Sequence, residues 1–410
     1  MASLRTLDAD ALDTLDLTDP RTHAEHDLTE VWRRLRKEQP FHRHRPVAGS
    51  DGFWVVTRHA DVSDLYRDTR RFTSEKGNVL TTLLLGGDSA AGMMAAVTDG
   101  PRHSDLRTIL LKAFSPRVLT GVVENIQAAT RKLLLDAVAR EECDFAKDVA
   151  AHIPLNAICD LMGVAEEDRP FVLECTEAAL GSDGAVPSPA VAWQARNDIL
   201  AYFEKLAVER RRNPGTDAVS VLATGTLEGR PLTMDEIVVN CYSLILGGDE
   251  TSRLSMTGAV LAFMEHPDQW AALKSGEVSI ATAVEEVLRW TTPAIHFGRS
   301  ALEDVPVGDE GQVIRAGEIV TLWNGSANMD EEVFAEPGRF DLARTPNKHI
   351  AFGYGPHFCL GAYLGRAEIA AMLTALRDIV ATVEPNGEPR RVYSNLLCGV
   401  SSLPVAMTAE

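Results

Sequence analysis

The chain has few cysteines, and no two of them lie close together. Six occur in 410 residues, at positions 143, 159, 175, 241, 359 and 398. The absence of a CxxC pair argues against a zinc ribbon, a zinc finger or a dithiol redox motif. The chain also lacks a Gly-x-Gly-x-x-Gly or P-loop fingerprint and a cysteine set for an iron–sulfur cluster. Nucleotide, flavin and iron–sulfur chemistry would therefore have to come from a separate protein.

A leader segment and long apolar stretches are missing as well. The first twenty residues are acidic and contain no basic region followed by an apolar run, so we expect neither a signal nor a transit peptide. No apolar stretch approaches the roughly 18 residues of a membrane helix. The sequence therefore predicts a soluble cytoplasmic protein without a membrane partner, and most of its thiols should be reduced, buried and inert.

Basic residues are scarce relative to acidic ones. Lys and Arg total 40 against 59 Asp and Glu, which leaves a net charge of −19. The long-range field of such a chain repels nucleic acid and anionic membranes, so we expect neither as a partner. The composition is otherwise that of a globular protein, with 45% hydrophobic and 24% charged residues. Any electronegative ligand must therefore meet a local basic patch.

Helical periodicity dominates the chain, and short β-rich stretches interrupt it. The length alone suggests two or three domains, but no linker or internal repeat divides the chain. We expect a mainly α fold with small β-sheets in one large domain, residues 1–410. The predicted helices cover 27–38, 61–67, 104–113, 117–140, 144–162, 168–180, 190–212 and 234–264. The predicted β-rich elements lie near 50–57, 305–323 and 390–406.

Residues 77–101 differ in character from the helical segments around them. They are rich in Gly, Ala and Met and carry little charge. This composition is typical of a pliable apolar loop that covers a ligand, and equally of a poorly packed surface loop.

The segment 351–369, AFGYGPHFCLGAYLGRAEI, carries the strongest signal for chemistry. Three glycines and a proline surround Cys359, and a helical pattern begins directly after it. Glycines allow a tight loop, and a helix N-terminus stabilises a thiolate over a thiol. A single thiolate of this kind suits axial ligation of haem iron, or a nucleophile, better than zinc or an iron–sulfur cluster. The alternative is a buried structural cysteine in a glycine-rich turn.

Here the sequence resembles the cytochrome P450 haem-thiolate monooxygenases, in particular the soluble bacterial members that take electrons from separate proteins. The resemblance rests on the pattern F-G-x-G-x-H-x-C-x-G and extends over nearly the whole chain, from Trp54 to Val405. It implies haem b as the cofactor and Cys359 as the axial ligand of the iron. Gly353 belongs to the same loop, Phe352 would pack beside the sulfur, and His357 would reach a haem propionate. The chain departs from the bacterial pattern at Met329, where an Arg is common, and at Tyr363, where a Pro is common.

Two further stretches match the family and would face the haem. Gly247, Gly248, Asp249, Glu250 and Thr251 lie in the middle of a long predicted helix, where adjacent glycines cost roughly 1 kcal/mol each relative to alanine. The glycines would let this helix lie close to a flat cofactor and open locally. By resemblance Glu250 and Thr251 deliver protons to bound oxygen; the alternative is a helix kink without chemistry. His103, Arg107 and Arg299 match the family's cations for the haem propionates.

The sequence Glu286-Val287-Leu288-Arg289 places a carboxylate and a guanidinium three residues apart, so they share a helix face and can form an ion pair. Alone this pattern usually marks a solvated pair. In the resemblance it is the family's structural pair, and Arg339 would be its third member. These three residues are expected to be structural.

The implied reaction is reductive activation of O₂ and hydroxylation, or another oxidation, of an organic substrate. The expected electron donors are a ferredoxin and a ferredoxin reductase. Small ferredoxins are typically acidic, as this chain is, so docking needs a basic patch near the thiolate. Its expected members, each of which could equally be an ordinary solvated charge, are Lys112, Arg117, Arg344 and Lys348.

Substrate contacts are expected from residues 78–97, the helices near 170–195 and a largely apolar set of further positions. His296 is the exception, since it could bond a polar substrate group or turn toward a propionate. A weak analogy points to natural-product biosynthesis, with an acyl or aminoacyl substrate on a carrier protein. The alternatives are a free terpenoid, macrolide or aromatic substrate, a peroxide-using oxidase and a noncatalytic haem-binding protein. The named contacts are Leu244, Gly248, Ala294, Ile295, His296, Leu397 and Val400.

Overall fold

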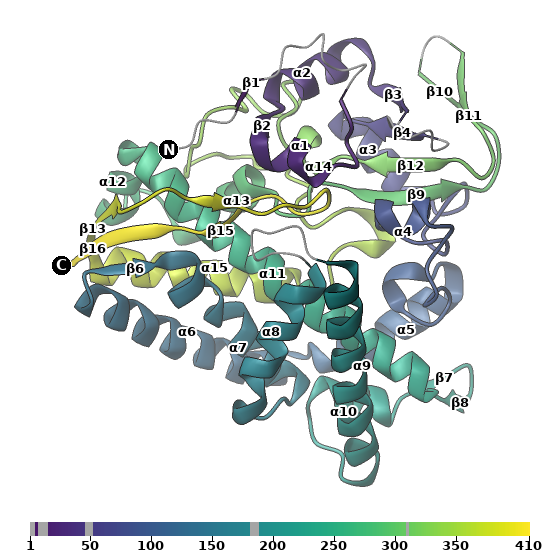
Figure 1. The fold of residues 1–410 in the computed structure, drawn as a ribbon, viewed down its shortest axis with the longest axis horizontal. Helices are drawn as coiled ribbons and strands as arrows, with labels where there is room; N and C mark the ends of the chain where they lie inside the picture. The colour runs from purple at the N-terminus through teal and green to yellow at the C-terminus, as the bar shows by residue number, and fades with distance from the viewer. Residues whose placement is uncertain (1–4, 7–14, 46–51, 181–187, 309–310) are drawn as a thin grey trace.

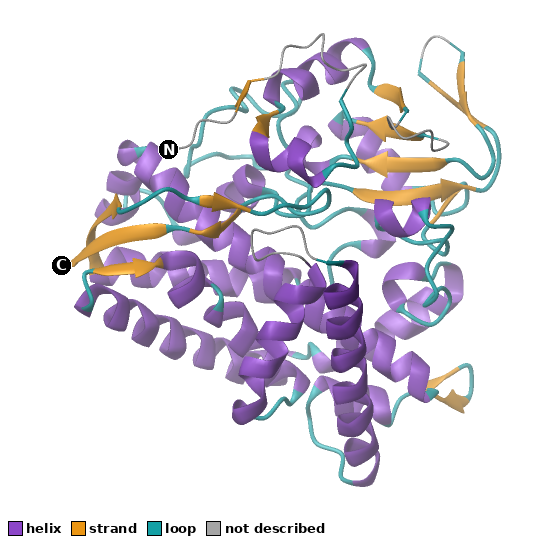
Figure 2. Ribbon diagram, viewed as in Figure 1, coloured by secondary structure: helices purple, strands orange, loops and turns teal. Residues whose placement is uncertain are grey.

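The structure is a computed structural model that describes residues 5–6, 15–45, 52–180, 188–308 and 311–410. Helices make up most of it, and small separate sheets lie at several places around them (Figure 2). The long helices are α2 (Thr29–Glu38), α3 (His59–Arg67), α5 (Gly100–Ala113), α6 (Pro116–Ala139), α7 (His152–Met162), α8 (Arg169–Leu180), α9 (Pro189–Arg212), α11 (Met234–Glu265), α12 (Pro267–Ser275), α13 (Ile280–Thr291) and α15 (Ala362–Ile379). The short ones are α1 (Pro20–Glu25), α4 (Leu80–Leu84), α10 (Ala218–Ala223) and α14 (Asn324–Ala327). The predicted mainly α class is confirmed.

Helix α11 crosses the centre of the molecule, and the largest hydrophobic cluster surrounds it (Figure 1). Its first turn begins with a capping box, in which Thr233 and Glu236 satisfy each other's backbone N–H groups. The helix runs to Glu265 without a proline, and Pro267 begins the next helix. A helix of this length, buried on most sides, forms a rigid axis against which the other elements are placed.

The largest sheet has five strands in the order β3-β4-β12-β9-β5 and lies on the opposite side of the molecule from α6 (Figure 1). Its strands are β3 (Phe41–His44), β4 (Phe53–Val56), β5 (Phe72–Thr73), β9 (Phe297–Ala301) and β12 (Ile319–Leu322). Strand β12 pairs with β4 in parallel and with β9 antiparallel. The β-rich stretch 305–323 therefore does not form a hairpin sheet by itself: only β10 (Val305–Val307) and β11 (Gln312–Ile314) form a hairpin, while β12 joins the larger sheet.

The remaining strands form smaller sheets. A three-stranded sheet has the order β13-β16-β6, and three two-stranded pairs complete the set. These strands are β1 (Arg5–Thr6), β2 (His26–Asp27), β6 (Glu142–Asp144), β7 (Thr226–Leu227), β8 (Arg230–Pro231), β13 (Val380–Pro385), β14 (Arg390–Arg391), β15 (Val400–Ser402) and β16 (Pro404–Ala409). The β-rich stretches expected near 50–57 and 390–406 are present, except that residues 50 and 51 lie outside the described residues.

The predicted helix over 144–162 divides into three parts. Residues up to Asp144 form β6, residues Ala146–Ala150 form a π-helical turn, and α7 begins at His152. The cause is tertiary, because Asp144 accepts hydrogen bonds from the backbone of Ala146 at 3.2 Å and Leu403 at 2.8 Å. These bonds hold the segment in the sheet beside β16 despite its helical pattern.

Candidate active site

The cysteine loop lies between a single 3₁₀ turn, Gly355–His357, and the start of α15. The backbone N–H of Cys359 donates to the carbonyl of Phe352 at 3.0 Å, which closes the loop. Gly353 and Gly355 have φ angles of 69° and 72°, the left-handed region that favours glycine. A Cβ at Gly355 would also lie 2.7 Å from the carbonyl oxygen of Tyr66. The two glycines thus permit the turn that presents the thiol.

The thiol itself is not stabilised as a thiolate by the protein alone. Burial raises the pKa of Cys359, and it outweighs the Gly361 amide and the positive charges of Arg107 and Arg366, which lower it. The sequence had suggested that the helix N-terminus favours the thiolate, but the cost of burial is larger here. A cation bound at Sγ would compensate for this cost, which fits an axial ligand of haem iron better than a free nucleophile.

Four predicted cationic side chains come together from three distant segments. His103 and Arg107 lie on α5, Arg299 lies on β9, and His357 lies in the cysteine loop. The rings of His103 and His357 stack with their centroids 4.2 Å apart. Burial, with the charges of His357 and Arg107, lowers the pKa of His103 to about 4, and burial also lowers the pKa of Arg107 and Arg299. The protein therefore places the guanidinium of Arg299 in a buried position and that of Arg107 in a partly buried one, beside a His103 ring that is neutral at physiological pH.

The acidic counterpart of this cluster is Asp99, which the sequence reasoning did not single out as a ligand. Its carboxylate lies 2.7 Å from Nε2 of His357 and accepts bonds from Thr73 and the Ser74 amide. Burial alone would raise the pKa of Asp99, but these bonds lower it to about 2. Within the described chain Asp99 is the one carboxylate that pairs with any of these four side chains, and it pairs with His357. The cluster is short of anions, as a site for the two carboxylates of haem requires.

The face of α11 that carries Thr251 borders an open space. A Cβ built at Gly247 would meet no heavy atom within 4 Å, whereas one at Gly248 would lie 2.8 Å from Ile158 on α7. Gly247 therefore faces the open space, and Gly248 allows close packing of α11 on α7, while contact of Gly248 with substrate stays a prediction. The Thr251 hydroxyl donates to the Gly247 carbonyl at 3.3 Å, a long bond. Leu244, Gly247 and Thr251 share one helix face.

Glu250 lies beside this face in a dry cluster of charges. It is 1% exposed and forms an ion pair with Arg253, which is also buried. Among the described residues, Oε2 of Glu250 has no hydrogen-bond partner. Asp249 is equally buried and accepts a hydrogen bond from Thr176 on α8 at 2.9 Å. Burial and the neighbouring charge of Glu250 raise the pKa of Asp249 to about 7.

The Glu286–Arg289 pair is present and fully buried on α13. The guanidinium of Arg289 donates to both carboxylate oxygens of Glu286 at 2.8 Å. The third cation is Arg344, which lies 3.1 Å from Glu286 with its side chain 9% exposed. Arg339 instead accepts a bond from Arg289 through its backbone carbonyl, and its side chain is 59% exposed. The expectation that the Arg339 side chain completes the pair is therefore wrong, because the chain turns its side chain outward.

Several expected substrate contacts meet at one place. Ala294 and Leu397 form an isolated antiparallel β-bridge, and the Ile295 N–H donates to the Leu396 carbonyl at 3.0 Å. Two segments a hundred residues apart thus lie side by side. Val400 differs, because it is 1% exposed in strand β15 within the main core. In the expected helices near 170–195, residues 181–187 lie outside the described residues.

The ring of His296 has partners that neither expectation anticipated. It is fully buried, its Nε2 lies 2.9 Å from the carbonyl of Asn395, and its ring packs on Trp323 at 4.5 Å. Burial lowers its pKa to about 3, so the ring is neutral at physiological pH. It packs in the wall formed by Trp32 and Trp323, and its Nδ1 has no hydrogen-bond partner among the described residues, so a contact with a polar substrate group or a propionate stays a prediction.

The structure also brings in residues that no sequence motif marked. Glu368 on α15 is fully buried, neither of its carboxylate oxygens has a hydrogen-bond partner among the described residues, and burial raises its pKa to about 8. Arg253, Thr176 and Glu368 each come from a different helix. The sequence does indicate such residues through the charged residues at 249–253 inside an apolar helix. Charges in this position predict buried partners but do not identify them.

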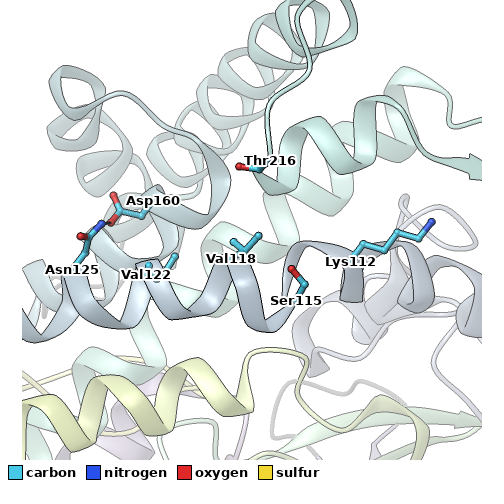
Figure 3. A pocket seen from close by; sticks show the side chains of 8 residues that line it. Lys112, Ser115, Val118, Val122, Asn125, Asp160 and Thr216 are labelled. Atoms are coloured by element: carbon cyan, nitrogen blue, oxygen red, sulfur yellow. Dashed lines mark hydrogen bonds between the residues drawn. The ribbon is translucent and has the colours of Figure 1, made fainter.

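The four expected docking charges separate in the structure. Lys112 and Lys348 are exposed, and the side chain of Arg117 lies outside the described residues. Arg344 is bound to Glu286 and cannot belong to a docking surface, so that expectation is wrong. Figure 3 shows Lys112 at one end of a groove between α5, α6 and α7, with Asp160 and Asn125 at the other end. Exposed apolar side chains lie on the same segments as Lys112 and the thiol, namely Leu111, Phe358 and Tyr363.

Fold and site define a haem-thiolate protein, and comparisons with known proteins agree. Residues 280–396 match the family model "Cytochrome P450". The chain is 48% identical over 408 residues to cytochrome P450 NovI of Streptomyces niveus, with all of both chains covered. It is 33% identical to a steroid C26-monooxygenase of Rhodococcus jostii, covering 95% of this chain and 84% of that one.

Solved structures extend this similarity to the fold. The crystal structure of P450 OxyD, described as involved in the biosynthesis of vancomycin-type antibiotics, matches with a TM-score of 0.87 at 32% identity. The match covers 97% of this chain and all of that one. The chain therefore belongs to the cytochrome P450 family and is a haem monooxygenase. Within the described residues, no helix is long and apolar enough to cross a membrane.

Proposed function

We propose that this cytochrome P450 hydroxylates, or otherwise oxidises, an acyl or aminoacyl group on a carrier protein in natural-product biosynthesis, as a single cytoplasmic domain. Similarity to OxyD over nearly the full length supports the biosynthetic role. The monooxygenase class rests on one observation, the convergence of the Cys359 loop and the anion-poor cation cluster from distant segments. A free small-molecule substrate, such as a terpenoid, macrolide or aromatic compound, is the second candidate, and the similarity to a steroid monooxygenase favours it.

The residues present fit haem b. Cys359 would ligate the iron, and Arg107, Arg299 and His103 would neutralise the propionates, with His357 held by Asp99. When bound, haem supplies the reductive activation of O₂. Arg299 shows the fit best, because it is 3% exposed and, within the part of the chain that the structure describes, its guanidinium donates only to the carbonyl of Gly298, at 2.7 Å. A buried guanidinium with so few hydrogen bonds is stabilised by an anionic partner.

Glu250 and Thr251 would control protons on the distal side. The long bond from Thr251 to the Gly247 carbonyl leaves the hydroxyl free to turn into the open space. Glu250 would carry protons from the interior, since its Oε2 is buried without a partner. Comparing turnover with a ferredoxin system and with peroxide in Thr251→Ala tests this role. In Thr251→Ala, turnover driven by ferredoxin should be lost while turnover driven by peroxide is kept. Unchanged turnover with both donors would contradict this role. Peroxide-driven turnover alone in the wild type would indicate a peroxide-using oxidase.

We expect electrons from a ferredoxin and its reductase at a surface that includes Lys112 and Lys348. A positive side chain favours association with an acidic donor and speeds it at low salt. Lys112→Glu should slow reduction by the donor about three- to tenfold at low ionic strength without changing haem content. Stopped-flow reduction measures this, with Lys76→Glu as a surface control. Equal reduction rates in the wild type and Lys112→Glu would remove Lys112 from the docking surface.

The substrate is best found by a binding screen that follows the haem absorbance. Free acids, free amino acids and the same groups on a carrier protein are compared at equal concentration. A spectral shift with carrier-bound forms alone supports the proposal. A shift of similar affinity with free compounds favours the second candidate. The strongly red-shifted absorbance of the ferrous carbon monoxide complex serves as the control for the haem-thiolate state.

A further inference from the structure

The side chain of Asn240 fastens the loop before α5 to α11. Asn240 is 1% exposed, and its Oδ1 accepts a hydrogen bond from the backbone N–H of Ala95 at 2.9 Å. Its Nδ2 donates to the carbonyl of Met93 at 2.8 Å and to that of Glu236 at 2.6 Å. Both N–H groups of the amide and its oxygen are thus used. Two of the three bonds reach the loop, one on each side of Met94.

A second clamp holds the same loop one turn earlier on α11. Arg102 donates from Nε to the carbonyl of Gly92 at 2.6 Å, and its other nitrogens bind Glu228 and Glu236. Hydrogen bonds from Arg230 and Thr233 lower the pKa of Glu236 to about 2, so this carboxylate stays ionised. Glu236 and Asn240 are four residues apart and therefore share a helix face. One face of α11 thus binds the loop at Gly92, Met93 and Ala95.

The loop is also closed by its own hydrogen bonds. The Gly92 N–H donates to the Val97 carbonyl at 3.1 Å, and the Thr98 hydroxyl donates to the Met94 carbonyl at 2.7 Å. The preceding segment differs: Gly77, Gly86 and Gly87 have φ angles of 124°, 100° and 131°. The side chain of Leu85 in that segment is 83% exposed. Within the loop expected over 77–101, residues 92–98 are therefore held by the two clamps and by their own hydrogen bonds.

The position of Asn240 on α11 connects this clamp to the site. Asn240, Leu244, Gly247 and Thr251 fall within about 60° of one another around the helix axis at 100° per residue. They form one stripe, and its C-terminal end is the open face at Gly247. Backbone atoms of residues 93–95 are thus fixed over the N-terminal end of the stripe that faces the proposed substrate. The clamp determines how close the loop lies to that face.

We propose that Asn240 is a specificity-determining positioning residue, which fixes the backbone of residues 93–95 beside the substrate-facing stripe of α11 and so limits the size of ligand admitted. The inference rests on the proposed placement of substrate against this stripe. It does not depend on which substrate the enzyme oxidises. It predicts that loosening the clamp changes selectivity for size while the haem site stays intact.

The test compares wild-type holoenzyme with Asn240→Leu, which keeps the volume and removes the three bonds, and with Asn240→Asp, which keeps the acceptor for Ala95. Hydrogen exchange of peptides covering 90–98 should be about five- to tenfold faster in Asn240→Leu, the effect of losing one or two buried hydrogen bonds. Affinities for imidazole and 4-phenylimidazole, which bind haem iron, report size selectivity. In Asn240→Leu, the affinity for 4-phenylimidazole divided by the affinity for imidazole should be at least about threefold higher than in the wild type.

Asn197→Leu is the matched control, because Asn197 also donates to a carbonyl four residues earlier, at 2.8 Å, but on α9. It should change neither readout. Faster exchange with an unchanged ratio of ligand affinities would overturn the role in selectivity, and unchanged exchange would overturn the clamp. If Asn240→Leu loses haem, Arg102→Gln and Asn240→Asp give the same two readouts. Failure of the proposed function would appear separately, as a missing carbon monoxide signature in the wild type.

Discussion

Two Glu–Arg pairs with the same spacing occupy two buried helices, and their surroundings differ. Glu286 and Arg289 on α13 are each 0% exposed, and both carboxylate oxygens of Glu286 are bonded. Glu250 and Arg253 on α11 are as deeply buried, but Oε2 of Glu250 has no partner. Spacing and burial alone therefore cannot distinguish a structural pair from one placed for chemistry. The number of satisfied hydrogen bonds does distinguish them.

The difference has a physical basis. A buried carboxylate is stable only when its lone pairs are matched by donors, as in Glu286, which also accepts bonds from Arg344, Asn347 and the Asp341 amide. A buried carboxylate without matching donors is destabilised by its lost hydration. Binding a proton or a hydrogen-bond donor therefore lowers its free energy. Glu250 is therefore suited to exchange protons. Glu286 is suited to hold residues 341–347, which precede the cysteine loop, in place.

The largest effect is expected from breaking the satisfied pair. Glu286→Gln should destabilise the protein by about 3–5 kcal/mol, because Arg289 and Arg344 both lose their charged partner. Glu250→Gln should cost less, about 1–2 kcal/mol, because Glu177 at 3.8 Å and Asp249 still compensate Arg253. Chemical denaturation of the haem-loaded proteins measures both values.

Glu285→Gln is the control on the same helix turn, since Glu285 is partly exposed and binds Arg366. Its loss should not exceed about 1 kcal/mol. Equal costs for Glu286→Gln and Glu250→Gln would contradict the distinction drawn between the two pairs.

The corrected third member of the structural pair provides the next test. Arg344→Ala should cost about 2 kcal/mol, because Arg344 binds Glu286 and the carbonyls of Ala335, Glu336 and Arg339. Arg339→Ala should stay within about 0.5 kcal/mol of the wild type, since its exposed side chain forms a 3.7 Å ion pair only with the exposed Glu336 among the described residues. Thermal unfolding measures the stability lost in each variant. A larger loss for Arg339→Ala than for Arg344→Ala would restore the role first expected for Arg339.

The smallest effect concerns pH and the unmatched cluster. The pKa of Asp249 lies at about 7 in the folded protein, above its ordinary value of 3.8. An acid with a raised pKa stabilises the fold while protonated, and this contribution is lost as the pH rises through 7. Between pH 5.5 and 8 the wild type should lose about 1–2 kcal/mol relative to Asp249→Asn, which cannot ionise.

Denaturation at the two pH values measures this difference. Ionisable neighbours that face Asp249 are common to both proteins and cancel in the comparison: Glu250, Arg253, Glu177, Cys159 and Glu368. Asp64→Asn is the control, since its side chain is 72% exposed and should show no such slope. Parallel pH profiles for the wild type and Asp249→Asn would show that Asp249 is ionised throughout.

Much of the helical fold follows from local pattern. The helix over 234–264 ends one residue from its predicted limit, because proline-free apolar periodicity and a capping box are local properties. The segment 144–162 was predicted less well, since bonds from Asp144 to Leu403 override its periodicity. Pairing across 259 residues leaves no trace in a local pattern.

The sequence by itself determined the class of this protein, because Cys359 and its glycines form a motif whose geometry is encoded within ten residues. It also determined which side chains carry charge near the haem. Only the tertiary structure decided which of them are matched: that Arg344 and not Arg339 completes the Glu286 pair, that Gly248 packs on Ile158, and that Asn240 holds the loop before α5. The reason is that partners in a buried network come from distant segments, and only packing brings them within hydrogen-bond distance.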